Sequence, residues 1–177
     1  MKRTRSELIL AGPNLRSWLS DEESKSGLIA LVQQRHVRVT LILATYETLQ
    51  PISREGSIHL RESVKDILQM TGKLARREKD LMRAYFHTGA ATLSAVFIDP
   101  DSSDGLLFFS PRWAIQFLPQ DRLTCVVDKA MNSEGLFKAL YNGVLLMRQG
   151  DAKSLEEMAA EAGLAPRASR AEDGGQG

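Results

Sequence analysis

Residues 86–113 read FHTGAATLSAVFIDPDSSDGLLFFSPRW, and this stretch decides the fold. The run from Thr92 to Ile98 is mostly apolar and partly β-branched or aromatic, and a second apolar run follows at 106–109. Between them lies DPDSSDG, which is dense in residues that favour turns. Continuous apolar runs of this length are typical of strands buried on both faces. The stretch therefore predicts two strands, joined by an acidic turn, within an α/β domain.

The chain before this stretch predicts a βαβ unit. A short apolar strand, Leu8-Ile9-Leu10, ends at a Gly-Pro turn. Ser20 and Glu23 have the spacing of a capping box for a helix that runs to about residue 36. The run 37–44 is the clearest strand in the chain, so we expect a right-handed crossover and a parallel strand pair.

The rest of the chain completes a single domain. Apolar residues at helical spacing predict a helix over 57–77, and a weaker pattern predicts a strand over 81–86. After the hairpin we expect a strand over 122–128 and a helix capped by Asn132 or Ser133. The predicted fold class is α/β, a mixed and largely parallel sheet flanked by helices. It occupies 1–150 and is followed by a capped helix over 151–164 and a disordered tail over 165–177.

Composition excludes few functions. The chain has 177 residues and a formal net charge of +1, so nothing draws it as a whole to nucleic acid or to an anionic membrane. Basic residues cluster only locally, at Lys2-Arg3-Arg5 and over 73–79. No apolar run approaches the roughly 20 residues of a membrane span. Cys125 is the single cysteine, which fits a cytoplasmic protein because it leaves no internal disulfide to form.

Several strings resemble one repeat of the phospholipase D-like superfamily, over roughly residues 7 to 148. The run 34–39 is similar to the family's step from its first helix into its second strand, and 93–99 to the strand that carries its HxKxxxxD signature. Phe109-Ser110 resembles the start of its G-S-x-N segment, and 122–128 its closing strand. The resemblance implies a phospholipase D-like fold. In the family a His attacks a phosphodiester, a Lys holds the phosphate, and single-repeat members build the site as homodimers.

The sequence departs from that family at the reactive positions. Counting back from Asp99 puts Thr92 at the place of the His and Ser94 at the place of the Lys. Arg112 stands where the downstream Asn belongs. A hydroxyl does not replace an imidazole nucleophile without a base to activate it. The sequence therefore predicts a catalytically inactive module for ligand sensing or protein interaction, which uses no cofactor and forms a homodimer.

Losing the nucleophile need not remove the pocket. Thr92 and Ser94 would offer hydroxyl donors from one face of a strand, beside Asp99 and Ser110. Arg112 would supply a cation, and a loop after the first strand would add Asn14 and Arg16 as a pocket wall. We therefore expect a phosphate-bearing small molecule or a nucleotide as ligand. The predicted site residues are Asn14, Arg16, Thr92, Ser94, Asp99, Ser110 and Arg112.

Two other functions stay open at this point. A phosphodiesterase or nuclease would have to use His87, which lies five positions before the expected His and would need a strand bulge to reach the pocket. A DNA-associated regulator would use the basic clusters and the helix over 154–164, which resembles half of a helix-turn-helix. No set of residues has the spacing of a zinc or calcium site, so we expect no metal.

Overall fold

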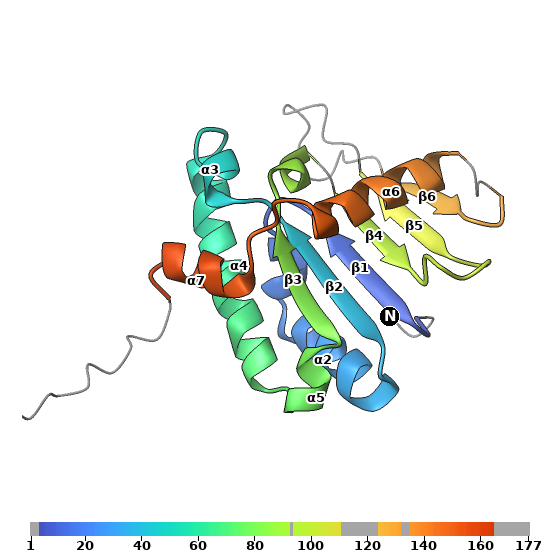
Figure 1. Ribbon diagram of the computed structural model, residues 1–177, viewed down its shortest axis with the longest axis horizontal. Helices are drawn as coiled ribbons and strands as arrows, with labels where there is room; N and C mark the ends of the chain where they lie inside the picture. The colour runs from blue at the N-terminus through green and yellow to red at the C-terminus, as the bar shows by residue number, and fades with distance from the viewer. Residues whose placement is uncertain (1–3, 93, 111–123, 132–134, 165–177) are drawn as a thin grey trace, which may run out of the picture.

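The computed structural model describes residues 4–92, 94–110, 124–131 and 135–164. One mixed sheet of six strands runs through these residues in the order β3-β2-β1-β4-β5-β6. The strands are β1 Glu7–Ala11, β2 Arg38–Leu43, β3 Met82–Phe86, β4 Ala95–Ile98, β5 Leu106–Phe109 and β6 Cys125–Asp128. Figure 1 shows the sheet with helices on both sides, which confirms the predicted α/β class.

The sheet divides into two halves of different pairing. β1, β2 and β3 pair in parallel, as the βαβ pattern predicts for the first two. β4 then pairs antiparallel with β1, and β5 and β6 continue the antiparallel ladder. The hairpin expected between β4 and β5 is therefore present. Parallel pairing accounts for two of the five strand pairs, a smaller share than the sequence suggested.

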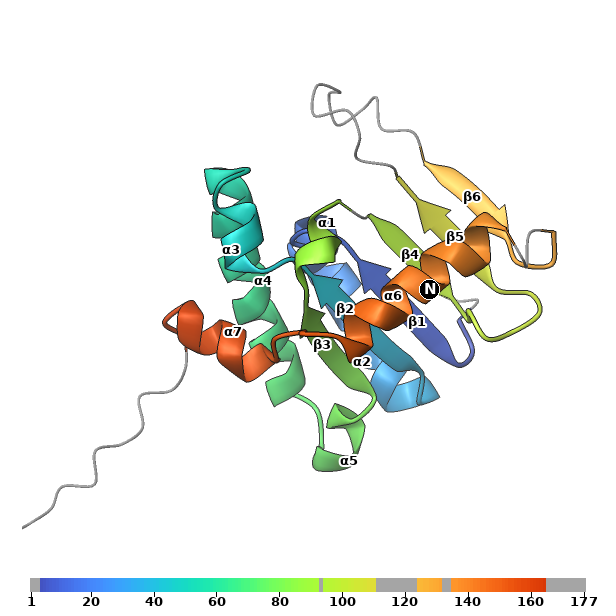
Figure 2. The ribbon, with the colours of Figure 1, turned by 45° about the horizontal axis from the view of Figure 1, so that its top comes forward.

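Helices cover the sheet unequally. α6 (Leu136–Gln149) crosses one face from β6 to β3, as Figures 1 and 2 both show. α2 (Glu22–Arg35) and α4 (Arg54–Gly72) lie on the other side, and α7 (Leu155–Glu161) lies beside α4. Short pieces complete the set: α1 Arg16–Leu19, α3 Tyr46–Leu49, α5 Arg76–Lys79 and the 3₁₀ helix η1 Thr88–Thr92.

The core follows the alternation of the central strands. Leu8 and Leu10 of β1 are buried on the side away from α6, with Leu41 of β2 beside Leu10. On the opposite face, Phe97 of β4 stacks edge-on against Phe137 of α6, with ring centroids 5.7 Å apart. Both faces of the central strands are therefore buried and, apart from polar residues such as Glu7 and Thr40 on the α6 side, apolar, which explains the continuous apolar runs.

Several predicted helix starts lie at other residues. Asp21, not Ser20, caps α2, because its carboxylate accepts the amide of Ser24 at 2.7 Å. The N-cap of α6 is Gly135, which offers no side chain, rather than a residue at 132 or 133. Ser154 and Glu157 form the predicted capping box of α7, and Gly163 follows that helix at a φ of +65°. The predicted tail over 165–177 lies outside the described residues.

Candidate functional site

The cation of the expected pocket wall after β1 is paired with carboxylates of α4. The side-chain oxygen of Asn14 accepts the amide of Arg16 at 3.1 Å and so shapes the turn into α1. The Arg16 guanidinium lies against α4, 2.6 Å from Asp66 and 3.2 Å from Glu62. Because these two carboxylates hold the guanidinium, Arg16 docks α1 on α4, and its assignment to a ligand site stays a prediction.

Thr92 is not on the strand where the motif spacing placed it. It ends the 3₁₀ helix η1, and its hydroxyl donates to the carbonyl of Gly89 at 3.2 Å. Ser94 precedes β4, and its carbonyl accepts the amide of Ser110 at 2.8 Å. Thr92 and Ser94 therefore do not share a strand face, because Thr92 lies in η1 and β4 begins at Ala95.

Ser110 lies at the same end of the hairpin as Ser94. Its hydroxyl is 3.2 Å from the hydroxyl of Thr124, which precedes β6. The structure brings Ser94, Ser110 and Thr124 together at this corner of the sheet. Arg112, the expected cation of the pocket, lies outside the described residues.

Asp99 serves the opposite end of β4. Its carboxylate accepts the amides of Arg5, Ser6 and Glu7 at 2.9, 2.7 and 3.0 Å, and the Ser6 hydroxyl at 2.9 Å. Only 5% of the residue is exposed, and its φ is +48°, in the left-handed region that Asp tolerates better than most residues. Asp99 is thus the residue that holds the start of β1 against the end of β4.

The pKa of Asp99 reflects this role. Burial alone would raise the pKa of the carboxyl, but the backbone amides of Glu7, Ser6 and Arg5 and the Ser6 hydroxyl outweigh it and hold the pKa below its usual range. Asp99 is therefore an ionised acceptor with a full set of donors. About five residues of extended chain, roughly 17 Å, separate it from Ser94. The structure does not bring Asp99 together with the other predicted site residues.

His87 is placed at the junction of β3 and η1. Its backbone amide donates to Leu43 at 2.8 Å, and its Nδ1 accepts the amide of Gly89 at 2.9 Å. No carboxylate contacts the ring among the described residues. As for a metal site, the described residues as a whole contain no group of three or more His, Cys, Asp or Glu side chains that would hold an ion. The Nδ1 atom of His87 is thus already hydrogen-bonded to the backbone amide of Gly89.

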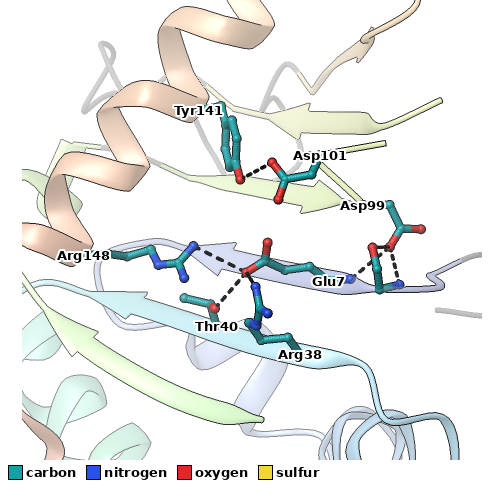
Figure 3. Close-up of polar contacts among 8 residues, drawn as sticks. Glu7, Arg38, Thr40, Asp99, Asp101, Tyr141 and Arg148 are labelled. Carbon is teal, nitrogen blue, oxygen red and sulfur yellow. Dashed lines mark hydrogen bonds and ion pairs between the residues drawn. The ribbon is translucent and has the colours of Figure 1, made fainter. Parts of the chain in front are cut away.

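A buried polar cluster that the sequence did not reveal lies under α6 (Figure 3). Glu7 is 3% exposed, and its Oε1 lies 3.4 Å from Arg148 of α6 and 3.7 Å from Arg38 of β2. The hydroxyl of Thr40 donates to the same oxygen at 3.5 Å. A buried carboxylate needs such partners, because desolvation of an unpaired charge costs several kcal/mol. This cluster fastens the end of α6 to the two central strands.

A groove runs along the outer side of β3. Its cavity has a volume of about 580 Å³, and its walls are β3, the end of α4 and the segment 152–156 that leads into α7. At one end the segment pairs with the strand, because Phe86 and Lys153 exchange both backbone hydrogen bonds, at 3.1 and 2.9 Å. At the other end lies α5 with its basic residues. The sequence signalled only the basic residues, since the groove depends on the packing of α7.

A second hollow, of about 670 Å³, lies between α3, α4 and α7. Arg54 and Arg61 of α4 line it, and Arg61 donates through Nε to the carbonyl of Ala162 at 3.1 Å. Burial raises the pKa of the Tyr46 phenol, which also lines the hollow, to about 12. The Tyr46 hydroxyl has no hydrogen-bond partner among the described residues.

Comparison of the chain with family models, with curated proteins and with solved structures gives no match. In the part of the chain that the structure describes, no helix has both the length and the apolar character needed to cross a membrane.

Proposed function

We propose that this chain is a catalytically inactive, phospholipase D-like module that serves ligand sensing or protein interaction in the cytoplasm. The observation that carries the proposal is the role of Asp99, whose carboxylate is taken up by the first residues of β1. Thr92 supports it as well, because its hydroxyl is directed to the backbone of η1. Of the positions that correspond to the family's reactive residues, Asp99 therefore holds strand β1, and Thr92 bonds its own turn.

The runner-up, a phosphodiesterase that uses His87, finds less support. A His nucleophile or base is normally oriented by a third group, most often a carboxylate. The Nδ1 of His87 instead accepts the amide of Gly89, and no described carboxylate contacts the ring. The motif cation is missing too, since Ser94 stands at its place.

Activity assays test the choice between these two functions. A bis-aryl phosphodiester and single-stranded DNA are offered to the purified protein, and we expect background rates of hydrolysis from both. The matched variants are His87→Ala and His59→Ala, and His59 is a half-buried residue of α4. Hydrolysis that is lost in His87→Ala and kept in His59→Ala would overturn the proposal and establish a phosphodiesterase that uses His87.

We further propose a homodimer, supported by a sheet face that the described residues leave partly exposed. Val96, Phe108 and Val126 stand in register on β4, β5 and β6, on the face away from α6. The first two are half-buried, and Val126 is 60% exposed. Two copies that buried this face would remove apolar area from water, and twofold pairing is the commonest arrangement.

Light scattering at micromolar concentration tests the dimer. Val126→Glu would place a charge on the uncovered face and should convert the dimer to monomer, because an unpaired buried charge is costly. Ile52→Glu is the matched control, since Ile52 is similarly exposed at 64% but lies before α4. A wild-type protein that is monomeric, or variants that dissociate equally, would contradict the proposal.

A phosphate-bearing ligand remains a prediction for the corner at Ser94 and Ser110. Arg112 would supply its positive charge. Titration of phosphate or a nucleotide into wild type and Arg112→Ala, followed by thermal shift, checks it. A site occupied at about 100 times its dissociation constant stabilises the fold by about 2.7 kcal/mol. An equal shift in both proteins would show that Arg112 does not bind the ligand.

A further inference from the structure

The outer edge of β3 is an unpaired strand edge over most of its length. β3 is the terminal strand of the sheet, and its inner edge bonds β2 through residues such as Leu81 and His87. Hydrogen-bonding direction alternates along a strand, so Phe86, which bonds Lys153, marks the residues that point outward. Met82 and Ala84 share that direction. No described residue bonds their outward N–H and C=O groups.

The chain already uses this edge once. Lys153 pairs with Phe86 in the antiparallel sense, as the first residue pair of an added strand would. The pairing then stops, because Ser154 caps α7 and the chain turns away from the sheet. Beyond that point the groove continues along Ala84 and Met82 towards α5. The edge is therefore open where a further strand would extend the pairing that Lys153 begins.

The walls of the groove leave room for a backbone. Gly72, Ala84 and Ala152 line it, and all three have small side chains or none. A Cβ added at Gly72 would meet no atom within 4 Å, so the space beside the end of α4 is open. Small residues at such a site allow another main chain to approach closely. The cavity of about 580 Å³ gives an extended segment a place to lie.

Charge indicates which kind of segment fits. Lys79 and Arg83 line the groove, and Lys73, Arg76 and Arg77 lie at its α5 end. Arg83 has one exposed partner, Asp80 at 3.6 Å. The other four form no ion pair with any described residue. Lys153 is already paired with Glu47 and Glu161, at 2.8 and 2.7 Å. One exposed carboxylate, Glu156 of α7, also lines the groove, but the cations outnumber it, so the charge of the groove towards α5 is positive.

We propose that an extended, acidic segment of a partner protein adds to β3 as a further strand of the sheet. Its main chain would bond the outward groups of Met82 and Ala84, and its carboxylates would face Lys79 and Arg83. This inference rests on the proposed role in protein interaction and names the partner's chemistry. A second copy of β3 fits less well, since it would bring these cations against their own counterparts.

Selection from a displayed library of random twelve-residue peptides tests the proposal. The bait is the 177-residue protein, with counter-selection against Gly72→Trp, which fills the groove without a clash at the Cβ. Gly143→Trp is the matched control, because an added Cβ there also meets nothing within 4 Å and Gly143 does not line the groove. We expect enriched peptides to be rich in Asp, Glu and β-branched residues, to bind Gly143→Trp like wild type, and to lose at least about tenfold in affinity for Gly72→Trp.

Two further variants separate main-chain pairing from charge. Ala84→Pro removes one outward amide and keeps the ladder to β2, as edge positions allow, and should weaken the selected peptide about tenfold. Lys79→Gln combined with Arg83→Gln should weaken it similarly and reduce its salt dependence. Circular dichroism confirms that each variant is folded. A peptide that binds all variants equally, or a selection that enriches no acidic sequence, would overturn the proposal.

Nucleic acid is the alternative occupant of the basic end. A single-stranded oligonucleotide whose binding falls in the Lys79 and Arg83 variant, but not in Gly72→Trp or Ala84→Pro, would assign these cations to phosphate and overturn the proposal. The outcome is independent of the phosphodiester assay. Hydrolysis that depends on His87 would refute the inactive module, whereas failure of peptide selection would leave it standing and refute only the strand addition.

Discussion

The two ends of β4 differ in what holds them. At one end, the Asp99 carboxylate accepts three backbone amides and a hydroxyl from residues 5–7 and is almost fully buried. At the other end, Thr92 is exposed, and the hydroxyl that the motif would place in a pocket bonds its own 3₁₀ turn. One stretch of sequence thus supplies a structural anchor and a lightly held corner. Motif spacing in a sequence does not by itself establish a shared site.

The largest effect is expected from a substitution of Asp99, which anchors one end of β4. Asp99→Ala removes every acceptor for the amides of Arg5, Ser6 and Glu7 and places alanine at a positive φ. We expect a loss of about 2–4 kcal/mol in the free energy of unfolding, measured by urea denaturation. Asp101→Ala is the control: among the described residues Asp101 accepts a single hydrogen bond, from the Tyr141 hydroxyl, and its loss should cost about 0.5–1 kcal/mol. Equal losses would show that Asp99 is not an anchor.

Low pH should reduce the stabilisation that Asp99 provides at the same end of β4. Because the folded pKa of Asp99 lies below the ordinary value of 3.8, its ionised form stabilises the protein above that pH. The contribution is lost as the pH falls through the folded pKa. Asp21 and Glu157 also have lowered pKa values, from the hydrogen bonds that Ser24 and Ser154 make to them. The acid dependence of wild type alone would therefore include these two groups. Subtracting the stability of Asp99→Asn, which keeps both of them, isolates the contribution of Asp99.

We expect the stability difference between wild type and Asp99→Asn to be constant between about pH 5 and 7 and to shrink below about pH 4. Denaturant unfolding at stepped pH values measures it. A difference that stays constant down to pH 2 would mean that the charge of Asp99 contributes nothing, and that only its geometry anchors β1.

The sequence predicted much of the fold because local patterns were unambiguous there. Leu8 to Leu10 and the run 37–44 are apolar, short and bounded by turn residues, and they form β1 and β2. The predicted start of β4 at Thr92 was wrong, since β4 begins at Ala95. The prediction extended the strand because Thr92 and Leu93 continue the apolar run in the sequence. Gly89 and the two alanines after it favour strand poorly, and the amide of Gly89 bonds the His87 ring instead.

The site was less predictable than the fold, because its residues are distant in sequence. Asp99 bonds residues more than 90 positions earlier, and Glu7 meets Arg148 across 141 positions. Arg16 stood in a loop and suggested an anion site, but its partner Asp66 lies 50 residues further on. Pattern and spacing carry no information on such contacts, since they depend on which helix packs against which strand.

A smaller effect is expected at the lightly held end. Thr92→Ala removes one hydrogen bond from an exposed side chain, and Ser94→Ala removes a hydroxyl for which the structure shows no partner among described residues. Each should change the free energy of unfolding by no more than about 0.5 kcal/mol. Thermal melts of both variants beside Asp99→Ala measure the contrast. A loss above about 2 kcal/mol in either would mean that this corner is as firmly held as the other.

The last variant is expected to have no effect on activity. It tests whether the absence of the motif His and Lys is by itself enough to explain the proposed lack of phosphodiesterase activity. Thr92→His combined with Ser94→Lys restores the two motif residues in sequence. Thr92 lies in η1 and Ser94 precedes β4, so the new imidazole and ammonium would not share one strand face. Asp99 would remain about 17 Å away along the chain, occupied by the start of β1. We therefore expect no turnover of a bis-aryl phosphodiester above the wild-type background. Turnover that required both substitutions would show that this corner still folds as a catalytic pocket, and the contrast between the two ends of β4 would then lie in residue identity and not in structure.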